Sequence, residues 1–314
     1  MLEFSTVVFP NFYCTFATYL ILYLMRIIEP SELIINPDGS IFHLHLHADQ
    51  IADNILLVGD PGRVETVSSF FSKKEFTVSN REFVSTTGLF NGKRITVVST
   101  GIGTDNIDIV VNELDALANI DLKTRAVKDS HRKLTLVRLG TSGALQPDIP
   151  LASYVLTEIS IGFDGLLNFY ANRDKVCELE MEQAFLKHTN WNDQCAKPYF
   201  TFSADRLVKL FEDFTIKGVT ISAPGFYGPQ GRVLRLPLAD PKLNEKIESF
   251  NYNGRRITNF EMESSAINGL SKLMGHDSVT ICAIIANRVV KDATKDYRPA
   301  IKNLIEQSLI KLSQ

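Results

Sequence analysis

The stretch Leu134-Thr135-Leu136-Val137-Arg138-Leu139-Gly140-Thr141-Ser142-Gly143 joins an apolar run to small residues that are typical of a turn. A continuous apolar run is typical of a strand that is buried on both faces of a parallel sheet. Arginine is almost never buried without a partner, so Arg138 near the end of this run needs an anion. The stretch therefore predicts a buried strand that ends at an anion-directed turn.

Two earlier segments show the same pattern of an apolar strand, a glycine-rich turn and a helix. Residues 55–58 precede Gly59-Asp60-Pro61-Gly62-Arg63, and residues 94–99 precede Thr100-Gly101-Ile102-Gly103-Thr104. Helical spacing follows each turn. The first turn of a helix offers free N–H groups to an anion, and an arginine there adds a fork suited to phosphate. An ordinary β-turn remains the alternative at residues 59–63, which lack the Gly-Lys-Ser/Thr ending of a P-loop.

The rest of the chain continues this alternation. Further strands are predicted at residues 154–157, 218–222 and 279–286, a helix at residues 298–312, and a hairpin at Asn91-Gly92. We therefore expect a single α/β domain with a largely parallel or mixed sheet over residues 31–314. Ligands of such folds bind beyond the carboxyl ends of the strands, where the unusual turns could form one cleft.

Two polar segments lie beside predicted strands. Glu261-Met262-Glu263 sets two carboxylates one residue apart, and buried carboxylates need donors such as the hydroxyls of a ribose. The loop at residues 223–232 holds Phe226, Gln230 and Arg232, which together suit a base edge and a ring. The alternatives are a surface turn with its acids near a helix dipole, and a rigid surface loop.

Three histidines alternate in Ile41-Phe42-His43-Leu44-His45-Leu46-His47. Strict alternation predicts that an extended segment would present all three on one face, which is enough for a zinc site. Neither cysteine nor acid ligands lie nearby, so a polar strand face is the simpler interpretation. We expect no metal here, and a single histidine that meets a substrate hydroxyl.

Composition narrows the classes of function. The 314 residues are 45% hydrophobic with a net charge of −3, so no basic field indicates a nucleic-acid partner. The four cysteines are scattered without metal spacing, which favours a reduced, cytoplasmic protein. Residues 1–30 form an apolar extension, with no charge between Phe4 and Met25. A start misassigned upstream of Met25, a membrane anchor and a signal segment all remain open for it.

From residue 41 onward, the chain resembles the nucleoside phosphorylases of the hexameric or trimeric class, and among them the uridine phosphorylases. The resemblance rests on seven segments in the family's order: Phe42-His43-Leu44, Gly59-Asp60-Pro61-x-Arg63-Val64, Arg81-Glu82-Phe83, Ser99-Thr100-Gly101-Ile102-Gly103, Arg138 to Gly143, Phe226-Tyr227-x-x-Gln230-x-Arg232 and Glu261-Met262-Glu263-Ser264. It implies a three-layer fold whose central mixed sheet is partly barrel-like and flanked by helices.

The resemblance also implies roles for individual residues. Phosphate would be held by Gly59, Arg63, Arg138, Thr141 and, from a neighbouring subunit, Arg81. Ribose would be held by Met262, Glu263 and the neighbour's His43, and the base by Phe226, Gln230 and Arg232. Of these, Arg138, Glu263, Gln230 and Arg232 would be catalytic. Partners would be a uridine-like nucleoside, phosphate and further copies of the chain, arranged as dimers within a hexamer.

The implied reaction converts uridine and phosphate into uracil and ribose 1-phosphate, with no cofactor. The family's potassium site matches at Glu82 and Ile102 but not at Asn106, so potassium stays an open alternative. Purine-specific relatives place an aspartate after the last strand, where this chain has Asn287-Arg288. A purine nucleoside phosphorylase, a nucleosidase that uses water and a non-catalytic nucleoside-binding protein are the rival interpretations.

Overall fold

Twelve strands form one mixed sheet in the computed structural model, which describes residues 27–314. The main strands are β1 (Asn54–Val58), β2 (Lys73–Asn80), β3 (Phe83–Phe90), β4 (Lys93–Ser99), β7 (Thr135–Ala144), β8 (Tyr154–Gly162), β9 (Tyr199–Phe202), β10 (Ile216–Ser222), β12 (Arg255–Glu261) and β13 (Asp277–Asn287). The short strands are β5 (Ile120–Asp121), β6 (Ala126–Val127), β11 (Asn251–Tyr252) and β14 (Asp292–Ala293). The helices are α2 (Pro61–Ser68), α3 (Thr104–Asn119), α4 (Leu179–Thr189), α5 (Asp205–Phe211), α6 (Leu243–Ser249), α7 (Ser264–Leu273) and α8 (Arg298–Ser313).

The sheet curls until one of its strands meets an earlier one. The strand order runs β12-β10-β8-β13-β7-β1-β4-β3-β2, and β12 also pairs with β7. That extra pairing closes β7, β13, β8, β10 and β12 into a five-stranded barrel. The expected mixed, partly barrel-like sheet is thereby confirmed.

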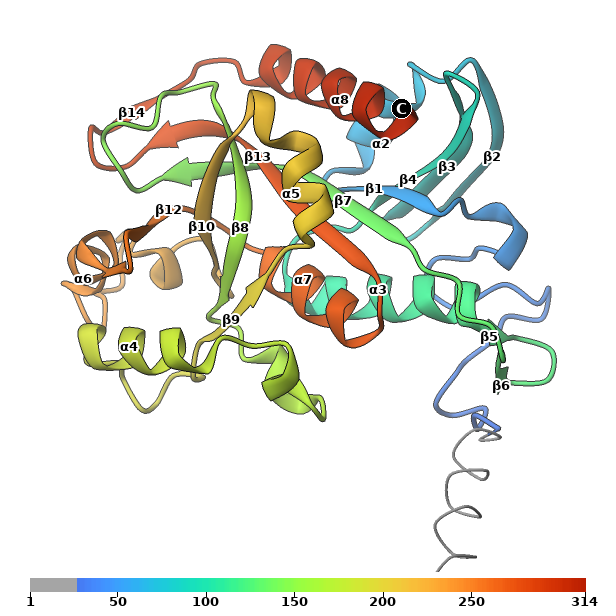
Figure 1. Ribbon diagram of the computed structural model, residues 1–314, viewed down its shortest axis with the longest axis horizontal. Helices are drawn as coiled ribbons and strands as arrows, with labels where there is room; N and C mark the ends of the chain where they lie inside the picture. Colours follow the sequence, from blue (N-terminus) through green and yellow to red (C-terminus); the bar gives the residue numbers. More distant parts are fainter. Residues whose placement is uncertain (1–26) are drawn as a thin grey trace, which may run out of the picture.

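Helices cover both faces of the open part of this sheet (Figure 1). Successive residues of β1 alternate between two cores: Ile55 and Leu57 pack in the cluster that contains α3 and α7, whereas Leu56 and Val58 pack in the cluster that contains α2, α5 and α8. A strand buried on both faces reads as a continuous apolar run, because both of its faces contact a core. The three-layer arrangement follows from this double burial.

The barrel brings together two groups of parallel strands that run in opposite directions. Strands β1, β4, β7 and β13 are mutually parallel through their pairings, and so are β8, β10 and β12. At the closure β12 runs antiparallel to β7, with Phe260 opposite Gly143. The chain after Phe260 therefore runs back along β7 toward Arg138, which carries Glu261 and Glu263 to that arginine.

Several predicted elements agree with the structure and two do not. The hairpin at Asn91-Gly92 joins β3 to β4, and both residues have positive φ, of 47° and 77°. The turn expected at Gly140–Gly143 was wrong, because β7 continues through these residues and pairs with β13 and β12. Residues with small side chains permit this close packing on both sides of the strand.

The second wrong prediction concerns residues 41–47. They form turns rather than a strand, and His45 has a φ of 56°. The backbone Leu46 O accepts from Ile41 N at 3.0 Å, which folds the segment back on itself. The alternation that predicted three histidines on one face therefore does not apply, and zinc ligation by this trio loses its geometric basis.

The apolar extension, at residues 1–30, falls almost entirely outside the described residues. Among residues 27–314, no helix is long and apolar enough to cross a bilayer. The interpretations of the extension and the cytoplasmic location stay predictions.

Candidate active site

A cavity of about 880 Å³ opens where the two groups of parallel strands meet. Its walls come from β7 itself, from Glu82 between β2 and β3, and from the ends of β1, β4, β10, β12 and β13 or the segments that follow them, so seven parts of the chain contribute. The residues that line it and enter the argument below are Gly59, Arg63, Glu82, Ile102, Asn106, Arg138, Thr141, Phe226, Gln230, Arg232, Met262, Glu263, Lys295 and Tyr297. The convergence predicted from the strand ends is thus present in the structure.

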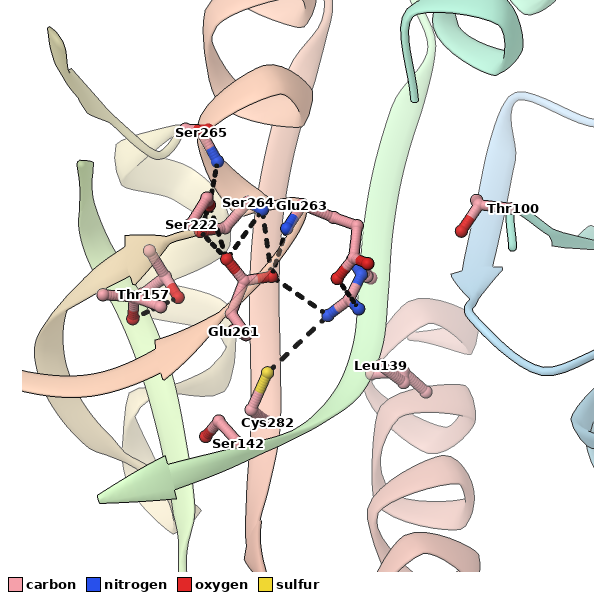
Figure 2. Close-up of polar contacts among 12 residues, drawn as sticks. Thr100, Leu139, Ser142, Thr157, Ser222, Glu261, Glu263, Ser264, Ser265 and Cys282 are labelled. Atoms are coloured by element: carbon pink, nitrogen blue, oxygen red, sulfur yellow. Dashed lines mark hydrogen bonds and ion pairs between the residues drawn. The ribbon is translucent and has the colours of Figure 1, made fainter. Parts of the chain in front are cut away.

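Arg138 is a buried member of the cavity lining. The residue is 5% exposed, and its guanidinium forms ion pairs with two carboxylates, that of Glu263 and, at 3.3 Å, that of Glu261. Burial alone would lower the pKa of Arg138, but the two carboxylates outweigh burial and raise that pKa. The arginine is therefore charged, and two acids compete for its single charge. Arg138 also donates to Cys282 Sγ at 3.7 Å, and Figure 2 shows the positions of Glu261, Glu263 and Cys282.

Glycine at position 140 makes room for this arginine. A Cβ at Gly140 would lie 2.2 Å from Arg138 Nη1 and 3.0 Å from Cys282 Sγ, both far inside contact distance. The arginine therefore folds back over a strand position that has no side chain. The Gly-Thr-Ser-Gly sequence contributes to the site by this close approach rather than by a turn.

The carboxylate of Glu261 is occupied by hydrogen bonds within the protein. Its carboxylate accepts from the backbone N–H groups of Glu263 and Ser264 and from the hydroxyls of Ser222 and Ser264, at 2.5–3.0 Å. These donors come from the end of β10 and the first turn of α7, where an acid also suits the helix dipole. The idea that both acids of the pair bind a ribose is therefore wrong for Glu261, which instead orients Arg138.

Glu263 has fewer partners and faces the cavity. Besides Arg138, it accepts from the backbone N–H of Gly103 at 2.8 Å, which ties the turn after β4 to the acid. Burial and the neighbouring Glu261 carboxylate outweigh the attraction of Arg138 and raise the pKa of Glu263 to about 7. A group of donors that entered the cavity, such as a vicinal diol, would stabilise its ionised form.

The turn at residues 59–63 forms the next wall. Asp60 caps α2 by accepting from Gly62 N at 2.9 Å, and Pro61 occupies the first helical position, so the helix begins at the cavity. Arg63 lies in the first turn and donates to Leu139 O at 3.3 Å. Burial lowers its pKa, and Arg138 lowers it further, so the two guanidinium groups are close enough to repel each other. An anion between them would relieve that repulsion.

The loop after β10 forms the opposite end. Arg232 Nη1 donates to Gln230 Oε1 at 2.5 Å and to Phe226 O at 2.6 Å, and its guanidinium lies 3.8 Å from the Phe226 ring centroid. Arg288 donates to the backbone carbonyl of Gln230. With its carbonyl oxygen taken, the Gln230 amide is left with two N–H donors for a ligand. This end of the cavity therefore offers donors beside an aromatic ring.

Nine of the predicted site residues line this cavity, and two do not. Those in the cavity are Gly59, Arg63, Arg138, Thr141, Phe226, Gln230, Arg232, Met262 and Glu263. Arg81 is exposed at the tip of the β2–β3 hairpin, with its guanidinium 5.7 Å from the Phe42 ring centroid. His43 Nδ1 lies 2.6 Å from Glu113 Oε1. The neighbour-shared roles of these two residues stay predictions.

Sequence reasoning missed the segment between β13 and α8. Thr294, Lys295 and Tyr297 line the same cavity as the arginines. The segment carries no glycine-rich turn and no aromatic–amide motif, so local sequence offered no signal beyond its position after a buried strand. That position alone could have placed it at the site, because ligands bind at the carboxyl ends of strands.

One group of described residues has metal-ligand chemistry, and it lies away from the cavity. Nitrogen and oxygen atoms of Asp115, His131 and His276 lie within 4.8 Å of one another. Leu134 N donates to His276 Nδ1, so the ring proton is on Nε2, which faces Asp115 Oδ1 at 3.1 Å. A metal would need that nitrogen without its proton, so these contacts fit hydrogen bonding instead. Glu82, Ile102 and Asn106 line the main cavity, and a potassium site there stays an open prediction.

A model of the phosphorylase superfamily matches residues 54–310. The chain belongs to this superfamily. Together with the relatives described next, this match supports a nucleoside phosphorylase, a pentosyltransferase with a nucleoside and phosphate as substrates.

Relatives and solved structures agree with the assignment. The phosphorylase is 28% identical to a uridine phosphorylase of Thermococcus kodakarensis, over 82% of this chain and 81% of the relative, and 27% identical to that of Escherichia coli, over 81% and 88%. A Trypanosoma brucei nucleoside phosphorylase that shows uridine phosphorylase activity superposes with a TM-score of 0.76 at 27% identity, covering 90% of this chain and 98% of that one.

Replacing Arg138 in this phosphorylase tests the charge cluster. Arg138→Met should lower the free energy of unfolding by about 3–5 kcal/mol at a pH well above 7, because two ionised carboxylates then lose their shared countercharge. At a pH well below 7 the loss should be smaller, since Glu263, with a pKa of about 7 in the native protein, then carries a proton. Urea denaturation at the two pH values measures both losses.

Arg256→Met is the matched control for this experiment. Arg256 pairs with Asp148 at the surface, so its loss should cost less than about 1 kcal/mol at either pH. An Arg138→Met penalty that is the same at both pH values would contradict the assignment of two acids to one arginine.

Proposed function

We propose that the chain catalyses the phosphorolysis of pyrimidine nucleosides, converting uridine and phosphate into uracil and ribose 1-phosphate. The observation that carries the proposal is the pairing of Gln230 with Arg232 at one end of a cavity whose other end holds Arg63 and Arg138. The first pair suits a base that leaves as an anion, and the second suits an oxyanion. A sugar bound between these two pairs of residues would lie beside the Glu263 carboxylate.

The phosphate end would supply the nucleophile. Arg63, Arg138, Gly59 and Thr141 line the cavity near the start of α2, and the two guanidinium groups would bind the anion. A phosphate oxygen would bond to the anomeric carbon as the bond from that carbon to the base breaks. The arginines would hold the phosphate in place. The negative charge of the phosphate would then stabilise the positive charge that develops on the sugar.

Glu263 would hold the ribose. Its carboxylate faces the cavity, and the 2′- and 3′-hydroxyls can donate to it while Met262 packs against the sugar. Binding requires the ionised acid, so the pKa of about 7 for Glu263 should make nucleoside affinity fall as the pH drops below 7. Arg138 contacts both this acid and the phosphate space, so it would couple the two substrates.

The base end favours uracil over a purine. Gln230 and Arg232 offer N–H donors to the carbonyl oxygens of a departing uracil anion, which needs no dedicated acid. A purine would need a proton donor after β13, but Asn287 donates both its amide hydrogens to the carbonyls of Gln146 and Ile149, at 2.9 and 3.0 Å. Asn287 is therefore part of the scaffold rather than a proton donor.

A direct assay tests this proposal. The purified full chain should release base from uridine only when phosphate is present, and should act more slowly on inosine. Thymidine measures tolerance for the 5-methyl group and for the missing 2′-hydroxyl. Faster turnover of inosine would indicate a purine nucleoside phosphorylase, and release of base without phosphate would indicate a nucleosidase; either result would overturn the proposal.

Gln230→Ala tests the base end. The variant should lose about 10²- to 10³-fold in kcat/KM for uridine, as expected when a preorganised donor to a developing anion is removed. The loss should be much smaller for 5-fluorouridine, because its more acidic base leaves with less help. Gln194→Ala, in an exposed loop outside the cavity, is the control. Equal losses on both nucleosides would mean that Gln230 does not stabilise the leaving base.

We also propose that neighbouring copies share their sites, as dimers within a hexamer. The support is that Arg81 and His43 lie outside their own chain's cavity although Arg63 and Arg138 lie within it. Mixed oligomers provide the test. Arg81→Ala and Gln230→Ala should each be weakly active alone, and refolding them together should restore part of the activity, since some sites then combine an intact Gln230 with a neighbour's intact Arg81. No recovery in confirmed mixed oligomers would exclude sharing through Arg81.

A further inference from the structure

A second cavity, of about 500 Å³, lies between the segment that follows α4 and the start of α6. Helices α4 and α6 are neighbours at one end of the molecule (Figure 1). Small-molecule sites are typically cavities of about 300–1,000 Å³ with mostly apolar walls and a few polar groups. This cavity has that composition, because prolines and the aromatic side chains of Phe163 and Trp191 line it. It shares no lining residue with the main cavity.

The two aromatic rings of this second cavity stand beside an acid. The ring centroids of Phe163 and Trp191 are 4.7 Å apart. Trp191 Nε1 donates to Ala196 O at 3.1 Å, which fixes the indole. Asp164 follows Phe163 in the sequence and lines the same cavity. One short segment therefore brings a carboxylate and two aromatic rings together.

Asp164 is a carboxylate without a countercharge in the described chain. It forms no ion pair with any of residues 27–314. Its donors, Leu166 N, Tyr199 Oη and Ser265 Oγ, are uncharged and lie at 2.8–2.9 Å. Burial raises the pKa of Asp164 in spite of these donors. A cation that entered the cavity would stabilise the ionised acid, because a nearby opposite charge favours the charged form.

The other charges around the second cavity favour a cation over an anion. Neither lysine nor arginine is among the described residues that line it. The second acid in the lining, Asp240, already pairs with Lys246 at 2.8 Å. An anionic ligand would therefore meet carboxylates and no countercharge. A cation would meet Asp164 and the faces of two aromatic rings, which also attract positive charge.

The second cavity lies against the loop that carries Gln230. Gly228, Pro229 and Gly231 line it, whereas Gln230 lines the main cavity. Asn244 also lines the second cavity and donates to Gln230 O at 3.3 Å. Gly231 permits this approach, since a Cβ there would lie 2.3 Å from Asn244 Nδ2. A ligand in the second cavity would therefore contact this loop without occupying the main cavity.

We propose that the second cavity binds an organic cation, an amine whose ammonium group pairs with Asp164 beside the rings of Phe163 and Trp191. The apolar body of the amine would lie against the prolines of the lining. Binding of such an amine needs neither a nucleoside nor phosphate, so it does not depend on the proposed phosphorolysis.

Three matched probes of different charge test this site. 4-Phenylbutylamine, 4-phenylbutan-1-ol and 4-phenylbutyrate share a ring and a chain but have a positive, a neutral and a negative end group at neutral pH. Trp191 is the only tryptophan in the sequence, so its fluorescence reports binding at this cavity, and titration calorimetry of the full chain gives each Kd. The amine should bind about tenfold more tightly than the alcohol, the effect of one charge-assisted hydrogen bond. The carboxylate should bind most weakly.

Asp164→Asn removes the charge and keeps the shape of the side chain. The Kd of the amine should rise about tenfold, whereas the Kd of the alcohol should change by less than about twofold if the cavity is intact. Asp193→Asn is the matched control, since it removes an acid from the loop of Trp191 outside the cavity, and should change the amine Kd by less than about twofold. Glu82→Gln removes an acid from the main cavity and should have as little effect.

Each outcome of these titrations supports or overturns the proposal. A loss of amine affinity confined to Asp164→Asn supports it. Equal affinities of the unmodified chain for the amine and the alcohol would overturn the preference for a cation. No saturable change in Trp191 fluorescence with any probe would overturn the site itself. An amine Kd that rises with Glu82→Gln and not with Asp164→Asn would place the amine in the main cavity instead.

The proposed function fails or stands by a separate measurement. Absence of phosphate-dependent turnover of nucleosides would overturn the phosphorolysis and leave the amine titrations unchanged. Normal turnover of uridine by a chain that binds no amine would overturn only the second site.

Discussion

One buried guanidinium that serves two carboxylates governs the rest of this structure. Arg138 can be buried only because Glu261 and Glu263 neutralise it, and Glu261 can be buried only because Ser222, Ser264 and backbone N–H groups complete its hydrogen bonds. Truncating Arg138 leaves its two carboxylates in a region of low dielectric without their countercharge. The same arrangement leaves Glu263 partly unsatisfied, with a raised pKa, and so ready to accept donors from a ligand. The stability of the fold and the binding of a ligand therefore depend on the same three side chains.

The barrel closure explains how these side chains meet. Pairing of β12 with β7 in opposite directions carries the residues after Phe260 back toward Arg138. Gly140 leaves the space that the arginine fills. The turn after β4 adds the N–H of Gly103 to Glu263, so three strands from distant parts of the chain converge on one acid. Each contact is short range, but the position of each partner depends on the curvature of the whole sheet.

Much of the fold and of the candidate site could be predicted from the sequence. The parts that could not be predicted were missed for physical reasons. The apolar runs at residues 55–58 and 134–139 predicted strands buried on both faces, because a strand between two layers has no polar side. The nine predicted site residues that line the cavity were assigned through the segments in which the chain resembles a known family, and some of those segments follow or continue these two strands. Local patterns carried no information about Gly140–Gly143, where small residues indicate a turn as readily as a tightly packed strand. They also missed Lys295 and Tyr297, whose place in the cavity lining depends on a hairpin and a helix start rather than on a motif.

The cavity walls come from seven parts of the chain between Gly59 and Tyr297, and this has a consequence for synthesis of the protein. While the ribosome is still adding β10, the nascent chain already carries Arg138 in an apolar strand, but neither of its acids has been made. Strand β13, which pairs with β7, has not been made at this stage either. Non-local strand pairing of this kind forms slowly because long loops must close first. The half-made chain thus exposes an unneutralised cation and an unpaired strand edge, which makes it a natural client for chaperones until its last fifty or so residues emerge.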